Sequence, residues 1–203
     1  MSVLGWPAQL AHGPVVVRPL RARDGAAWSE VRTRNEPWLS RWEGRPPSQR
    51  PLAWAARNSP GVFAAMLRTQ RREARAGRLL PFGITVDGRL RGALTVAGVT
   101  RGAYDGAHVG YWVDEAVAGR GVVPTALALV LDHCFGPVGL HRVEANVRPE
   151  NAASRRVVDK LGFRREGRHE RYLHIDGAWR DHLTYALVRD DVPEGLLRRL
   201  TSR

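Results

Sequence analysis

The chain has 203 residues, a formal net charge of +12 at pH 7 and one cysteine, Cys134. This length suffices to bury a full hydrophobic core, and we expect a single domain over residues 1–203. A lone cysteine excludes an internal disulfide, the opening MSVLGWPAQLAHGP lacks the pattern of a secretory signal, and no apolar run approaches the roughly 18 residues of a membrane span. We therefore expect a cytoplasmic protein with no membrane contact. The positive charge favours a phosphate-bearing cofactor or RNA, although an arginine-rich composition alone gives the same balance.

The first half of the chain predicts a strand, helices and a hairpin. The segment VVVRPLRARD (15–24) is typical of a strand, and Asp24 is placed to cap a helix over 25–34. A second helical pattern covers 52–76. The alternating apolar residues of LPFGITVDGRLRGALTV then predict two strands joined by a tight turn at Asp87-Gly88.

The second half alternates strands and helices. We expect strands over 107–113 and 140–147, an apolar helix over 123–135 that ends at Gly136-Pro137, a helix over 151–161 and a final hairpin around Asp176-Gly177. Because strands and helices are interleaved in this order, the sequence predicts a mixed α/β sheet covered by helices.

The stretch AVAGRGVV (116–123) joins a strand to the apolar helix through small side chains. The start of a helix carries unpaired N–H groups and the positive end of the helix dipole. Gly119 and Gly121 let a ligand approach the backbone closely, and Arg120 favours an anion. The pattern predicts a phosphate-binding loop, although a core helix preceded by a glycine turn would read the same way.

The order of three segments is more specific than any one of them. HVGYWVDEAVAGRGVVPTAL, HRVEANVRPEN and NAASRRVVDKLGF together resemble the GCN5-related N-acetyltransferase (GNAT) superfamily, and YLHIDGAWRDHLTYAL resembles its RimJ/RimL branch of ribosomal-protein alanine N-acetyltransferases. The resemblance covers about residues 15–189. It implies the GNAT fold, in which a mostly antiparallel mixed sheet has splayed middle strands and flanking helices.

The same resemblance implies a function. The cofactor would be acetyl-CoA, and the acetyl group would pass by direct attack in a ternary complex to an amine. The expected acceptor is the N-terminal α-amine of a protein such as a ribosomal protein. The resemblance is compatible with ribosome association and with either a monomer or a homodimer.

The resemblance places the coenzyme on main-chain groups. The pyrophosphate falls on the loop, and the pantetheine arm falls along the preceding strand, where the amide of Val113 would act as an oxyanion donor. Ala118 and Val123 depart from the family's usual residues at the two ends of the loop motif, and Pro124 has no N–H to donate. The residues implied for the cofactor are Tyr111, Trp112, Val113, Ala118, Gly119, Arg120, Gly121, Val122, Val123, Pro124, Asn151, Ser154 and Arg156, with Arg155 beside the last. Ordinary strand packing, a helix cap at Asn151 and solvated helix charges explain the side chains equally well.

At two catalytic positions the sequence departs from the family pattern. Asn146 stands where relatives often carry a glutamate base, so we consider Glu144, which lies on the same strand face, ahead of Glu170 and Asp181. Val158 occupies the place of the usual tyrosine acid, and Ser154 matches the serine of RimL-type members. Each carboxylate is equally consistent with a solvated charge, and Ser154 with support of a helix turn.

The remaining candidates have structural explanations of equal weight. Cys134 reads as a small core residue, and we expect no metal because the histidines lack ligand spacing with it. His182 is expected to make a structural hydrogen bond. Trp38 and Trp42, four residues apart, line the acceptor mouth or simply pack. The run RTQRREARAGR (68–78) is an exposed helix face or a surface for RNA or an acidic partner.

Two other functions fit parts of the sequence. Acetylation of a small amine such as an aminoglycoside requires the same cofactor, but a polycationic acceptor favours a pocket rich in carboxylates, which this basic chain does not display. A non-catalytic module that binds acetyl-CoA or RNA would explain why Asn146 and Val158 replace the usual glutamate and tyrosine.

Overall fold

The computed structural model describes residues 5–47 and 52–202, and its centre is an eight-stranded sheet. The strands lie in the order β1-β2-β3-β4-β5-β6-β8-β7, and every neighbouring pair is antiparallel except β5 and β6. This is the mostly antiparallel mixed sheet that the sequence predicts. The strands are β1 Leu10–His12, β2 Val15–Pro19, β3 Leu79–Val86, β4 Arg89–Thr100, β5 Gly106–Val113, β6 Arg142–Val147, β7 Arg164–Ile175 and β8 Ala178–Val188.

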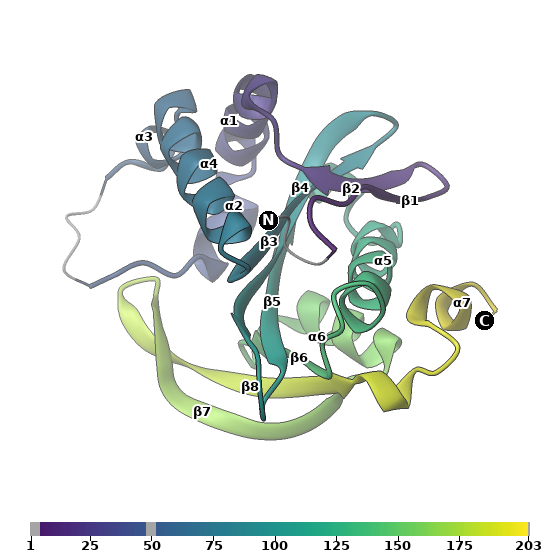
Figure 1. Ribbon diagram of the computed structural model, residues 1–203. Helices are drawn as coiled ribbons and strands as arrows, with labels where there is room; N and C mark the ends of the chain where they lie inside the picture. The colour runs from purple at the N-terminus through teal and green to yellow at the C-terminus, as the bar shows by residue number, and fades with distance from the viewer. Residues whose placement is uncertain (1–4, 48–51, 203) are drawn as a thin grey trace.

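Helices cover the sheet on both faces (Figure 1). Helices α1 to α4 lie on one face, whereas α5, α6 and α7 lie on the other. The helices are α1 Gly25–Arg34, α2 Glu36–Leu39, α3 Trp54–Arg57, α4 Pro60–Arg75, α5 Val122–Phe135, α6 Ala152–Leu161 and α7 Leu196–Thr201, with 3-10 turns at Ala22–Asp24, Ser40–Trp42, Glu115–Val117 and Arg189–Asp191. None of the described helices is long and apolar enough to cross a membrane.

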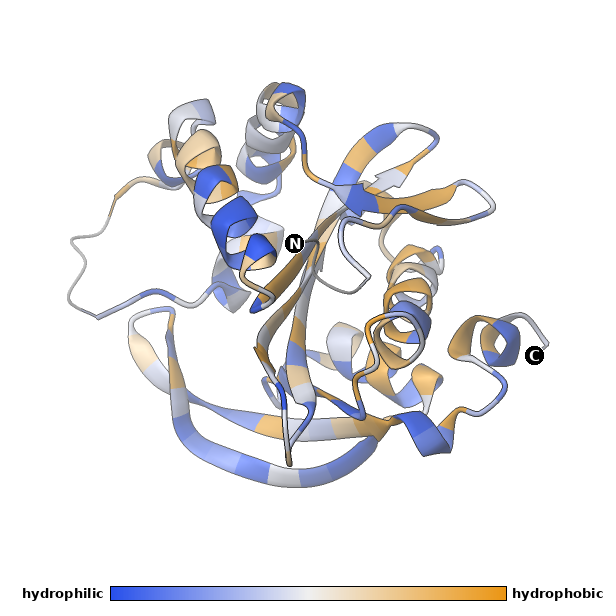
Figure 2. Cartoon of the chain, in the orientation of Figure 1, coloured by the Kyte–Doolittle hydropathy of each residue, from blue (hydrophilic) through white to orange (hydrophobic). Residues whose placement is uncertain are grey.

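Helix α5 forms the middle of the larger core. Its residues Ala126, Leu127, Val130 and Leu131 have no exposed surface, and the helix is mostly hydrophobic in Figure 2. A helix that is apolar on nearly every side is stable only when it is buried. Burial therefore fixes α5 against the sheet and leaves its first turn as the part that reaches the site.

Three sequence expectations need correction. Asp24 does not cap α1, because its carboxylate accepts hydrogen bonds from Arg18 and from the Arg21 N–H instead. The helix expected over 52–76 is two helices, since Ser59 caps a new start at Pro60. Strand β1 and helix α7 were not expected; α7 begins where its Leu196 and Leu197 amides bind Asp132.

The parallel pair β5 and β6 stays together over three positions only. Gly106, Ala107 and His108 pair with Arg142, Val143 and Glu144. Beyond this point β5 continues along β4 while β6 continues along β8, so the two strands diverge. The middle strands are therefore splayed, as the family resemblance implies.

A buried carboxylate fixes the far end of β5. Asp114 is fully buried and accepts hydrogen bonds from Arg34 at 2.7 Å, Asn35 at 3.1 Å and Arg91 at 2.8 Å. Burial alone would raise the pKa of Asp114, but these bonds and one from the Ala116 N–H outweigh it and hold the pKa well below its usual value. Asp114 thereby joins α1, β4 and the start of the loop that precedes α5.

We expect Asp114→Ala to destabilise the fold by about 2–4 kcal/mol, because it leaves buried donors without a partner while Arg34 retains some access to water. Chemical denaturation measures the change. Glu194→Ala is the control, since this exposed carboxylate lies 3.8 Å from Arg198 and its loss should change stability by less than about 0.5 kcal/mol. Equal stability of the two variants would show that the Asp114 cluster is not a structural anchor.

Candidate active site

A cavity of about 870 Å³ runs through the region where β5 and β6 separate. Its lining includes the loop before α5, the start of α6, the exposed edge of β5 and the helices on the opposite face. A second cavity of about 200 Å³ lies between β5, β6 and the β7–β8 hairpin, and the two share Trp42, Gly110, Tyr111 and Ser154 among their linings. The two cavities therefore adjoin at the opening between the strands.

The loop before α5 presents main chain to the larger cavity. Gly119 and Gly121 have φ angles of 75° and 78°, a conformation that favours glycine, and a Cβ added at either would meet no atom within 4 Å. Gly121 is the N-cap of α5 and the first intrahelical bond runs from the Thr125 N–H to the Gly121 carbonyl. The amides of Val122 and Val123 precede that bond and are available to an anion.

The structure places the predicted loop residues in two groups. Ala118, Gly119, Gly121, Val123 and Pro124 line the larger cavity. Arg120 has an exposed side chain, and Val122 points its side chain into the core, so neither side chain lines the cavity. Any part that these two play in binding an anion belongs to their main-chain amides.

The edge of β5 offers main-chain groups to the gap. The Asp114 N–H donates to the Arg91 carbonyl at 2.6 Å, and hydrogen-bonded pairs alternate along an antiparallel ladder. The next pair, Gly92 with Val113, is therefore not hydrogen-bonded, and the N–H and C=O of Val113 and Tyr111 point away from β4. Trp38 Nε1 donates to the Val113 carbonyl at 3.1 Å, which holds this end of the edge in place.

Helix α6 closes the gap on the side of β6. Asn151 caps the helix through its side-chain oxygen, which accepts from the Ser154 N–H at 3.0 Å, as the sequence predicts. Ser154 lines both cavities, and its carbonyl accepts a 3.4 Å hydrogen bond from the Tyr111 hydroxyl. Burial raises the pKa of Tyr111 to about 12, so this phenol stays protonated at neutral pH. Arg156 also lines the larger cavity, whereas Arg155 does not.

The carboxylates considered as bases do not line either cavity. Glu144 pairs with His108 at the closed end of the strands, and its carboxylate binds Arg142 at 2.9 Å. Asp181 is ion-paired with Arg168, and Glu170 is exposed on β7. Glu144 shares a strand face with Asn146, but the gap opens only beyond Glu144. A carboxylate held in this ion pair is poorly placed to take a proton from a substrate in the cavity.

Aromatic and charged side chains form the wall opposite the loop. Trp38 and Trp42 both line the larger cavity, as do Arg32 and Glu43. Arg32 is buried, lies 4.7 Å from the ring centre of Trp54, and is ion-paired with Glu43. Burial, with a smaller contribution from nearby Arg57, lowers the pKa of Arg32 to about 10, so it remains charged at neutral pH.

The β7–β8 hairpin reaches this wall. Gly44 forms a bridge with Ile175, and the Arg45 N–H donates to the His174 carbonyl at 3.0 Å. The contact joins two segments that are far apart in the chain and closes the smaller cavity at its outer side. Sequence reasoning missed both the hairpin contact and the buried Arg32, because neither leaves a local pattern.

The remaining candidates lie away from the cavities. Cys134 is fully buried on α5, and burial raises the pKa of its thiol to about 12, which fits the expected core residue. Val158 is fully buried in the core and cannot donate a proton. Among the described residues no three His, Cys, Asp or Glu side chains come close enough together to hold a metal ion.

Comparison with known proteins agrees with this geometry. Residues 15–164 match the family model described as an acetyltransferase (GNAT) domain. The chain therefore belongs to the GNAT acetyltransferase family.

Individual relatives include acetyltransferases of ribosomal proteins. RimJ from Mycobacterium smegmatis, solved in complex with a CoA disulfide, is 43% identical, with 100% of this chain and 97% of that chain covered at a TM-score of 0.93. The ribosomal protein uS5-alanine N-acetyltransferase of Escherichia coli is 28% identical over 189 residues, which are 92% of this chain and 94% of that protein. The probable N-acetyltransferase YjcK of Bacillus subtilis is 40% identical over 112 residues, but the match spans only 62% of that protein.

Proposed function

We propose that this chain transfers an acetyl group from acetyl-CoA to the N-terminal α-amine of a protein, with a ribosomal protein as the acceptor. The observation that carries the proposal is the larger cavity, which joins the glycine loop, the free edge of β5 and the wall of Trp38 and Trp42 in one space. Such a space can hold a phosphate-bearing coenzyme at one end and an extended peptide at the other. The name of the Escherichia coli relative, a ribosomal protein uS5-alanine N-acetyltransferase, supports the same acceptor.

The residues present fit the coenzyme. Two glycines at positive φ leave room for a pyrophosphate beside the first turn of α5, and Arg156 with Lys160 adds positive charge to the cavity wall. The unpaired edge of β5 matches an extended amide-bearing arm, which would lie beside it as a further strand. When bound, acetyl-CoA supplies the thioester whose acetyl group is transferred.

The protein groups around the gap divide the chemistry between them. The N–H of Val113 points into the gap and is placed to stabilise negative charge on a carbonyl oxygen. The hydroxyl of Ser154 holds a proton at the junction of the two cavities, where a departing thiolate needs one.

Helix α4 supports association with an acidic partner such as ribosomal RNA, because its Arg68, Arg71 and Arg75 are exposed.

Peptide acetylation tests the proposed function. We expect the purified protein to acetylate the α-amine of a peptide that begins with alanine, and not the same peptide with a blocked amino end, as measured by mass spectrometry. Transfer to an aminoglycoside but not to the peptide would favour a small-amine acetyltransferase. Sedimentation with ribosomes that is lost with added salt, without any transfer, would favour a non-catalytic RNA-associated module.

Gly121→Glu should lower the affinity for coenzyme A at least tenfold, because it adds a negative charge beside the expected pyrophosphate and forces a side chain into a left-handed conformation. Isothermal titration with coenzyme A measures the loss. Gly88→Glu is the matched control, since Gly88 has a φ of 74°, has no atom within 4 Å of an added Cβ, and does not line the cavity. Unchanged affinity in Gly121→Glu would remove the loop from coenzyme binding.

Ser154→Ala should lower kcat by about tenfold or more and leave the affinity for coenzyme A nearly unchanged, because it removes a proton donor and not the backbone cap. Steady-state kinetics with an alanine-starting peptide gives kcat. The Asn151 cap contacts the Ser154 N–H, which the substitution keeps, so thermal unfolding should change little. A wild-type kcat in this variant would assign Ser154 to the helix turn alone.

A further inference from the structure

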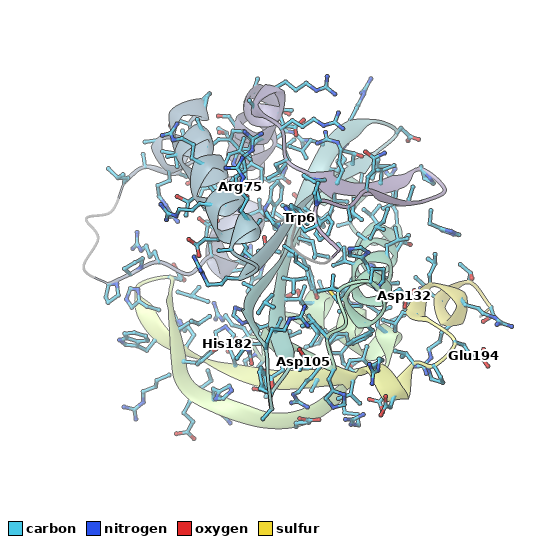
Figure 3. The ribbon with its side chains drawn as sticks, in the orientation of Figure 1. Trp6, Arg75, Asp105, Asp132, His182 and Glu194 are labelled. Atoms are coloured by element: carbon cyan, nitrogen blue, oxygen red, sulfur yellow. The ribbon has the colours of Figure 1, made fainter. Side chains whose placement is uncertain are left out.

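His182 on β8 lies at the junction between the site and the hairpin (Figure 3). Its side chain belongs to the wall of the smaller cavity, together with Gly110, Asn146 and Ser154. The residue is 3% exposed. The imidazole therefore lies close to the junction of the two cavities, at the opening between β5 and β6.

The ring is held in one tautomer. Nδ1 lies 3.1 Å from the Arg180 carbonyl oxygen, which can only accept, so Nδ1 carries the proton of the neutral ring and Nε2 keeps a lone pair. Nε2 has no hydrogen-bond partner among the described residues. Among the described residues, Gln70 Oε1 is the side-chain polar atom that is both buried from solvent and without a hydrogen-bond partner. Nε2 of His182 also lacks a partner but is not buried in this way, so it is open to the cavity.

The surroundings keep this imidazole neutral. Burial lowers the pKa of His182, partly opposed by the bond to the Arg180 carbonyl, with Arg148 lowering it further and Glu150 and Asp181 raising it. Because its pKa is lowered, the ring is uncharged and able to accept a proton at pH 7. The titratable and charged groups around it are Arg148 and Glu150 after β6, Arg180 and Asp181 on β8, and His169 and Tyr172 on β7, of which Tyr172 makes an edge-on ring contact at 5.5 Å.

We propose that Nε2 of His182 accepts the proton that the acceptor's ammonium group must lose before it attacks the thioester. The inference rests on the proposed function and names the base for it. Glu144, Glu170 and Asp181 do not line either cavity, and Asn146 cannot accept a proton as a base. The carboxylates that do line the larger cavity, Glu43 and Glu150, are ion-paired with Arg32 and Arg148.

The proton balance is simple. The N–H bond of the ammonium breaks, its electron pair stays on nitrogen, and the proton joins the lone pair of Nε2 to give an imidazolium and a neutral amine. The imidazolium later returns the proton to water. The second proton that the nitrogen loses on forming an amide ends on the CoA thiol, so each transfer releases one proton.

The pKa of the acceptor amine also affects how readily it gives up its proton. An α-amine has a pKa of about 8, whereas a lysine side chain has one of about 10.4. Proton transfer to an imidazole is therefore about two pKa units, or over a hundredfold, less favourable from lysine. The same difference applies to any base, and it favours amino-terminal amines over lysine side chains as acceptors.

The pH dependence of kcat/KM for an alanine-starting peptide tests the assignment. In the wild type the acidic limb should fall at or below pH 6.5, the usual pKa of histidine. His182→Asn keeps an N–H for the Arg180 carbonyl but removes the base, so its acidic limb should move to about pH 8, where the amine itself loses its proton. The variant should be about tenfold slower than the wild type at pH 7 and nearly equal to it at pH 9.

Two controls separate this effect from damage to the fold. His169→Asn alters the exposed histidine that pairs with His182 across the hairpin and should leave the profile unchanged. Both variants should bind coenzyme A with wild-type affinity. Should His182→Asn fail to fold, nitrogen NMR of the wild type reads the tautomer directly, and a proton on Nε2 above pH 7 would overturn the proposal.

The outcomes also distinguish this inference from the proposed function. If the wild type acetylates the peptide but His182→Asn has the wild-type profile, or is slower by the same factor at every pH, His182 is not the base and the function stands. If the wild type acetylates no α-amine, the function is wrong and the role of His182 falls with it.

Discussion

The separation of β5 from β6 after His108 is the feature on which the whole site depends. Strands of a sheet normally satisfy each other's main-chain groups, and here the pairing ends after three positions because β6 follows β8 and β5 follows β4. The N–H and C=O of Tyr111 and the N–H of Val113 are left facing a cavity, whereas the Val113 carbonyl accepts from Trp38 Nε1. A ligand with amide groups of its own can satisfy the groups that have no partner.

The opening needs to be held at both ends. At the end of β5, the buried carboxylate of Asp114 joins Arg34 and Asn35, at the end of α1, to Arg91 of β4. The segment that leads to the glycine loop begins at Asp114. On the other side, the Asn151 cap fixes the start of α6. The same contacts that stabilise the fold thus position the glycine loop and the wall of Trp38 and Trp42 around one cavity.

Local signals in the sequence were sufficient for the loop and for most elements. Gly119, Gly121 and Asn151 could be read correctly because a left-handed turn and a helix cap depend on neighbouring residues. Asp24 and Glu144 could not, because Arg18 and Arg142 hold these carboxylates in contacts that arise only from the fold. His182 was predicted to make a structural hydrogen bond, and its Nδ1 does so. That its ring also lines a cavity could not be predicted, because the cavity forms only when β8, β6 and the hairpin come together.

The central claim is that the coenzyme occupies the gap between β5 and β6. A crystal structure of the protein with coenzyme A tests it most directly. The account predicts the pyrophosphate on the amides of residues 119–123 and the pantetheine arm along the edge of Tyr111 and Val113. Coenzyme bound elsewhere, or a gap filled by the chain's own residues while the coenzyme is bound, would contradict it.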